Sequence, residues 1–104
     1  MARIEFSPGI EEVPTQVRLL KSKTGSRGSA IFRFEELKTD TQNILGMRMI
    51  DEEGELTTRN IKAKFLNGEF KALEVIYDME TEAEWERFLR FMERFSAANQ
   101  MGRA

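Results

Sequence analysis

The side chains that could do chemistry in this sequence are carboxylates, amines, hydroxyls and the phenol of Tyr77, because its 104 residues include no histidine and no cysteine. Imidazole bases, thiol nucleophiles, disulfides and nearly all zinc, copper and haem sites are therefore excluded. A carboxylate pair of the kind that glycosidases use needs a deep pocket, which a domain of this size rarely forms. The composition thus predicts a protein that is not an enzyme.

The densest group of candidate metal ligands is an acidic cluster formed by Asp51, Glu52, Glu53 and Glu55. Carboxylates bind hard cations, but a calcium loop needs its glycine after three alternating oxygen ligands. The cluster does not have that spacing. We therefore predict no metal site, and no cofactor of any other kind.

Three arginines near the C-terminus share one face of an expected helix, namely Arg87, Arg90 and Arg94. This face is either an anion-binding surface or a solvated surface on which glutamates of the same helix are the partners. Glu86 stands four residues before Arg90, in the favourable order for an ion pair. We therefore expect the second arrangement, with Glu84 and Glu93 as further partners.

Basic and acidic residues are unevenly distributed, although the net charge is only −2. Residues 13–34 contain five basic side chains and no acid, whereas residues 35–56 contain seven acids against two basic side chains. The two stretches either compensate one another as neighbouring strands or leave a positive surface for an anionic partner. On the second interpretation the partner-binding residues are Arg18, Lys21, Lys23 and Arg27.

The elements that position these residues are mostly strands, because apolar and polar side chains alternate between turn residues. The expected strands are residues 3–6, 16–22, 29–35, 44–50, 55–66 and 69–79. Asn67-Gly68 is the strongest hairpin signal, since a type I′ turn needs a positive φ at both central residues. Residues 55–66 are expected as one strand of about twice the usual length.

The C-terminal segment changes to a helical period. Its apolar residues recur on one face: Trp85, Phe88, Leu89, Phe91, Met92 and Phe95. Thr81 and Glu84 form a capping box, which predicts a helix over residues 81–98. The sequence therefore predicts an α+β fold in a single domain over residues 1–104, in which an antiparallel sheet of about five strands, within residues 3–79, is covered by one C-terminal helix.

A long strand over residues 55–66 would expose backbone amides at a sheet edge, and an extended partner segment could pair with them. Arg48, Arg59, Lys62 and Lys64 would then set register and specificity. Met47 and Met49 would give a yielding apolar contact. The alternative is that both methionines belong to the core and that the lysines only protect the edge.

Two phenylalanines on one expected strand, Phe32 and Phe34, could stack nucleobases. The aromatic-glycine motif of RNA-recognition domains is missing, and the net charge is nearly neutral. We therefore expect both rings in the core and no nucleic-acid partner. A single-strand nucleic-acid binder, or another peptide-binding adaptor, remains the alternative function.

Several short motifs together resemble the Psb28 family of soluble photosystem II assembly proteins. They are VRL at 17–19, GM at 46–47, MIDEEGE at 49–55, KFLNG at 64–68, EWERF at 84–88 and RFMERF at 90–95. The resemblance covers nearly the whole chain, and the helix motif is its most specific part. Phe95 stands where this family leads us to expect tyrosine, which leaves open whether the chain is the main form or a paralogue.

The resemblance implies a non-catalytic accessory factor without chlorophyll that binds transiently to immature photosystem II and assists its assembly or repair. It implies contacts with the inner antenna chlorophyll protein and the reaction-centre subunits, near the quinone-reducing side. The protein would be peripheral to the thylakoid membrane, on its cytoplasmic or stromal side. We expect a monomer, and the start of the chain favours a cyanobacterial or plastid-encoded protein over a precursor with a transit peptide.

Overall fold

The computed structural model describes residues 2–99, which form two four-stranded antiparallel sheets and one α-helix. The first sheet has the strand order β2-β1-β5-β6 and contains β1 (Arg3–Ser7), β2 (Ile10–Glu12), β5 (Met47–Asp51) and β6 (Gly54–Thr58). The second has the order β3-β4-β8-β7 and contains β3 (Gln16–Lys21), β4 (Gly28–Phe34), β7 (Ile61–Leu66) and β8 (Glu69–Met79). The helix α1 is Glu82–Asn99, and a short 3₁₀ turn is Thr41–Asn43.

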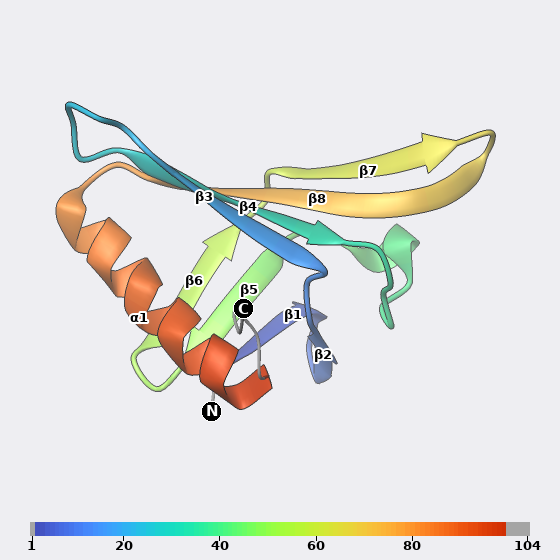
Figure 1. Ribbon diagram of the computed structural model, residues 1–104. Coiled ribbons are helices and arrows are strands. Elements are labelled where there is room, and N and C mark those ends of the chain that lie inside the picture. The colour runs from blue at the N-terminus through green and yellow to red at the C-terminus, as the bar shows by residue number, and fades with distance from the viewer. Residues whose placement is uncertain (1, 100–104) are drawn as a thin grey trace.

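The core lies between the second sheet and a layer formed by the first sheet together with α1 (Figure 1). Alternation along β4 places Phe32 and Phe34 on the inner face, where both side chains are fully buried. Phe88 of α1 meets Phe32 edge to face at a centroid distance of 6.1 Å. These rings belong to the core as expected, and neither presents a face on which a base could stack.

Two local predictions are confirmed by backbone geometry and hydrogen bonds. The amide of Glu84 donates to Thr81 Oγ1, and the amide of Thr81 donates to Glu84 Oε1, each at 3.1 Å, which is the reciprocal capping box. Asn67 and Gly68 both have positive φ, 54° and 80°, as a type I′ turn requires. The predicted α+β class is correct.

The predicted single sheet of about five strands is wrong in its count, because residues 2–99 form eight strands in two sheets. The expected long strand over residues 55–66 is also wrong. It is divided between β6 in the first sheet and β7 in the second.

The break falls at Arg59-Asn60, where tertiary hydrogen bonds redirect the chain. Thr58 Oγ1 donates to the carbonyl of Ile76 at 2.7 Å and accepts from the amide of Asn60 at 3.2 Å. The amide of Ile76 in turn donates to the carbonyl of Asn60 at 2.9 Å. The long strand of this fold is instead β8, with 11 residues, because it pairs with β4 along one edge and with β7 along the other.

Candidate partner-binding edge and hairpin

The strand β3 forms one edge of the second sheet and pairs only with β4 within the described part of the chain. The amide of Ser22 donates to the carbonyl of Arg27 at 2.9 Å, which fixes the alternation of hydrogen bonds along this pair. Because inward and outward amides alternate, those of Val17, Leu19 and Lys21 point away from β4. They form a short row of unpaired backbone groups.

An apolar groove of about 610 Å³ runs beside this edge, between β3 and one flank of α1. Its apolar lining consists of Val17, Leu19, Leu89 and Met92. Leu19 is 44% exposed and Leu89 is 37% exposed, so the groove opens to solvent. Val17 and Leu19 therefore line the groove with their side chains and also direct their backbone amides away from β4.

The groove exists because the apolar stripe of α1 is wider than the surface that it covers. Phe88, Phe91 and Phe95 are buried in the core, whereas Leu89 and Met92 lie at the margin. Residues on a helix face fan out over a broad arc, so the flank toward β3 stays uncovered when the centre packs on the sheet. One further strand beside β3 would cover it.

The basic residues predicted near the N-terminus gather on β3 and on the turn that follows it. They are Arg18, Lys21, Lys23 and Arg27, all of them exposed. Lys21 is bound to α1, since its Nζ lies 2.8 Å from Glu82 Oε2 and 5.2 Å from the ring centre of Trp85. Among residues 2–99, no acid lies within ion-pair distance of Arg18, Lys23 or Arg27. We call these four residues the basic hairpin.

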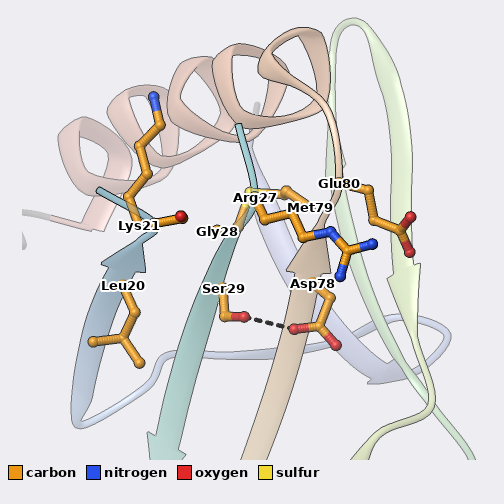
Figure 2. Close-up of a pocket in the computed structure, with 9 residues that line it drawn as sticks. Leu20, Lys21, Arg27, Gly28, Ser29, Asp78, Met79 and Glu80 are labelled. Carbon is orange, nitrogen blue, oxygen red and sulfur yellow. Dashed lines mark hydrogen bonds between the residues drawn. The ribbon is translucent and has the colours of Figure 1, made fainter. Parts of the chain in front are cut away.

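A hollow of about 490 Å³ lies at the base of the basic hairpin (Figure 2). Figure 2 shows Lys21 directed toward the helix, with Arg27 on the other side of Gly28 near Asp78 and Glu80. Ser29 Oγ donates to Asp78 Oδ1 at 2.6 Å. Both signs of charge line this hollow, so it does not select an anion.

The acidic cluster is joined to α1 by ion pairs that the sequence did not predict. Asp51 accepts from Arg87 Nη2 at 2.7 Å and from Arg94 Nη1 at 2.9 Å, and its side chain is 1% exposed. Burial raises the pKa of Asp51, but hydrogen bonds from both guanidinium groups outweigh it and lower the pKa to about 2. Asp51 also accepts from the amide of Glu53, which closes the turn between β5 and β6.

Glu53 extends this network along the helix. It accepts from Arg90 Nε at 2.8 Å and from Arg94 Nη1 at 2.6 Å. These hydrogen bonds, that from Arg90 above all, lower the pKa of Glu53 to about 2. The expected pairing of the arginines with glutamates of their own helix is therefore wrong, because the turn between β5 and β6 supplies the carboxylates. We call Asp51, Glu53 and the three arginines the ion-pair clamp.

Within residues 2–99, no three acidic side chains are arranged to hold a metal ion. The acidic cluster forms ion pairs with arginines of α1 instead, and Glu52 also lies 3.8 Å from Arg94 Nε. The sequence contained one signal for this arrangement: a stretch of four acids needs compensation, and three arginines share one helix face.

Three of the predicted partner-binding residues lie on β5 and are already engaged within the protein, two by burial and one by ion pairs. Met47 and Met49 are fully buried in the core, so they offer no contact to a partner, and the predicted apolar contact needs correction. Alternation along β5 points both inward, because Arg48 between them faces out. Arg48 is held by Glu5 at 2.7 Å and by Glu55 at 3.2 Å.

The remaining predicted residues lie away from β3. Lys62 and Lys64 are exposed on β7, at the opposite edge of the second sheet, and Lys64 Nζ is 3.6 Å from Glu74. Arg59 is exposed at the break between β6 and β7. The ten predicted residues therefore do not form one surface, and only the basic hairpin stays together.

Among residues 2–99, no helix is long and apolar enough to span a membrane. Residues 4–103 match the family described as Psb28 protein. The chain is 94% identical to the "Photosystem II reaction center Psb28 protein" of Synechococcus sp. strain JA-3-3Ab, over all of both chains. It is 50% identical to the protein of the same name from Nostoc sp. strain PCC 7120, over 98% of this chain and 96% of the relative. The chain therefore belongs to the Psb28 family, as its motifs predicted.

Proposed function

We propose that this protein is a non-catalytic accessory factor that binds core subunits of immature photosystem II and assists assembly or repair. It binds transiently at the cytoplasmic or stromal side of the thylakoid membrane, and an extended partner segment adds to the sheet at β3. The name of the relatives, which refers to the photosystem II reaction center, supports the choice of partner. The observation that carries the binding mode is the unpaired edge of β3 beside an apolar groove.

Strand addition at β3 explains why the outward amides and the groove coincide. Residues opposite each other in adjacent strands project to the same face of a sheet. A partner residue opposite Val17 or Leu19 would therefore place its side chain in the groove, against Leu89 and Met92. Main-chain hydrogen bonds supply affinity and the groove selects apolar side chains at alternate positions.

The basic hairpin adds electrostatic selectivity to the same edge. Arg18 projects from the outer face of β3, and Lys23 and Arg27 follow in the adjoining turn. Positive side chains beside a binding edge steer acidic segments toward it and raise the rate of association. We therefore expect the partner segment, or the residues that flank it, to be acidic.

The edge at β7 fits this role less well. Its regular outward amides are those of Ile61 and Ala63, because the register of its pairing with β8 shifts within β7, between Lys64 and Phe65. Lys62 and Lys64 alternate along it, which is how natural sheets protect an edge from pairing. We therefore propose β3 as the partner-binding edge, in place of residues 55–66, which the sequence suggested.

A proline substitution tests the proposal, because it removes one amide hydrogen and leaves the fold's own bonds in place. The amide of Leu19 points away from β4, so Leu19→Pro deletes only an outward donor. Leu19→Ala is the matched control, since it removes the same side chain and keeps the amide. Ala63→Pro removes an outward amide from the other edge.

The measurement is capture of photosystem II core subunits from detergent-solubilised cyanobacterial thylakoids by each tagged variant. Leu19→Pro should capture roughly tenfold less than Leu19→Ala, as the loss of one hydrogen bond of about 1.4 kcal/mol predicts. Ala63→Pro should capture as much as the unchanged protein. Equal capture by Leu19→Pro and Leu19→Ala would rule out pairing at this edge.

A further inference from the structure

The hairpin between β7 and β8 projects beyond the rest of the second sheet. β4 pairs with β8 only from Leu73 to Met79. Among residues 2–99, residues 69–72 of β8 and the end of β7 therefore have no partner strand other than each other. Figure 1 shows this hairpin extending away from α1 and from the first sheet. It forms a thin, convex tip.

The tip carries large apolar side chains in solvent. Phe65 is 60% exposed and Leu66 is 58% exposed, immediately before the Asn67-Gly68 turn. The ring of Phe65 meets that of Phe70 edge to face at 6.0 Å, which fixes its position across the hairpin. Two adjacent large apolar side chains that are exposed at a protruding turn are unfavourable in water. This arrangement therefore indicates a contact surface.

Positive charge surrounds these apolar side chains. Lys62, Lys64 and Lys71 are all exposed, and with Glu69 as the single acid, residues 61–71 carry a net charge of +2. Lysine stems can lie along an apolar surface while their ammonium groups reach phosphate. Apolar groups at a tip, with lysines around them, match the boundary between lipid headgroups and acyl chains.

We propose that the tip of the β7–β8 hairpin binds the surface of an anionic lipid membrane. Phe65 and Leu66 enter the boundary between headgroups and acyl chains, and the three lysines contact lipid phosphate. A fluid bilayer accepts a convex apolar tip without a matching pocket, whereas a protein partner needs a complementary cavity. β3 lies at the opposite edge of the sheet, so it stays free for a protein partner while the tip contacts lipid.

The test is sedimentation of the full chain with vesicles, in the absence of any photosystem protein. Vesicles of phosphatidylcholine and phosphatidylglycerol in equal parts are compared with vesicles of phosphatidylcholine alone. We expect binding to the anionic vesicles that weakens as salt is added. Because no protein partner is present, the result does not depend on strand addition at β3.

Two pairs of matched variants locate the contact. Phe65→Ser with Leu66→Ser should lower binding roughly tenfold, because the apolar contact is lost. Leu19→Ser with Leu20→Ser changes two leucines of similar exposure, 44% and 53%, on β3 and should bind normally. Lys62→Gln with Lys71→Gln should weaken binding more than Lys23→Gln with Arg27→Gln, although each pair removes two charges.

Several outcomes would overturn the proposal. One is an absence of binding to anionic vesicles at low salt. Another is that the tip variant, Phe65→Ser with Leu66→Ser, binds these vesicles as well as the unchanged protein does. If only the Lys23 and Arg27 variant loses binding, the basic hairpin and not the tip contacts lipid. If the tip variant keeps vesicle binding but loses capture of photosystem II subunits, the tip is a protein contact. Circular dichroism confirms that each variant is folded.

Discussion

At the scale of residues, Asp51 is the most constrained side chain of the ion-pair clamp. It is almost fully buried and accepts hydrogen bonds from Arg87 and Arg94 at once. Asp51→Asn removes the buried charge that Arg87 and Arg94 share and leaves Glu53 as their nearest acid. We therefore expect the free energy of unfolding to fall by about 2–3 kcal/mol. Urea denaturation measures this loss.

The neighbouring acid is the control for that prediction. Glu52 stands in the same turn but is largely exposed, and its nearest approach to Arg94 is 3.8 Å. Glu52→Gln should therefore change stability by no more than about 0.5 kcal/mol. Equal effects of the two substitutions would show that the clamp does not depend on Asp51.

The clamp also predicts how stability depends on pH. The pKa of Asp51 and that of Glu53 are about 2 in the folded protein, below their ordinary values of 3.8 and 4.5. A carboxyl whose folded pKa is lowered stabilises the fold fully above its unfolded pKa. The contribution should be complete above about pH 4.5 and be lost as the pH falls toward about 2.

Thermal unfolding between neutral pH and about pH 2 checks this dependence. The double variant Asp51→Asn with Glu53→Gln has no carboxyls left to titrate in the clamp. Its melting temperature should therefore fall less steeply with acid than that of the unchanged protein. Parallel curves for the two proteins would contradict the assignment.

At the scale of elements, the basic hairpin is predicted to steer partner binding. Lys23→Glu with Arg27→Glu reverses two exposed charges beside β3, so capture of photosystem II subunits at low salt should fall roughly tenfold. The remaining binding should also depend less on salt, because fewer attractive charge pairs are left to screen. Capture at several salt concentrations measures both effects.

Lys62→Glu with Lys64→Glu is the control for the basic hairpin. It makes the same change in net charge at the opposite edge of the sheet. This variant should keep its capture of detergent-solubilised subunits. If only the β7 variant lost capture, the partner-binding edge would be β7, within the residues 55–66 that the sequence suggested.

Elements could be predicted from the sequence where local chemistry decides them. The capping residues Thr81 and Glu84 and the Asn67-Gly68 turn act within a few residues of chain, and both were predicted correctly. The break at Arg59-Asn60 was not, since no glycine or proline marks it. It depends on hydrogen bonds that Thr58 and Asn60 make with Ile76, which only the tertiary fold brings close to them.

The candidate site was predictable to a smaller extent for the same reason. An acid-free run of charges can be seen in the sequence, and the basic hairpin stayed together in the structure. Burial of Met47 and Met49 depends on which face of β5 meets the core, and the partners of Arg87 lie more than thirty residues away along the chain. The groove beside β3 requires both the sheet and the helix, so no local pattern contains it.

At the scale of the whole molecule, the clamp and the proposed binding edge are parts of one arrangement. The ion pairs hold α1 against the turn between β5 and β6, while its aromatic residues pack into the core. The flank of the helix is therefore fixed relative to β3, and the groove is formed before any partner arrives. A preformed groove lowers the ordering cost of binding an extended segment.

Amide hydrogen exchange of the full chain, with and without photosystem II core complexes, tests the central claim of strand addition most directly. A strand paired with β3 must protect the amides of Val17, Leu19 and Lys21, which point away from β4. We expect new protection at these three alternate amides and little change at Ile61 and Ala63 of β7. Protection confined to α1, or to β7 with β3 unchanged, would contradict strand addition at β3.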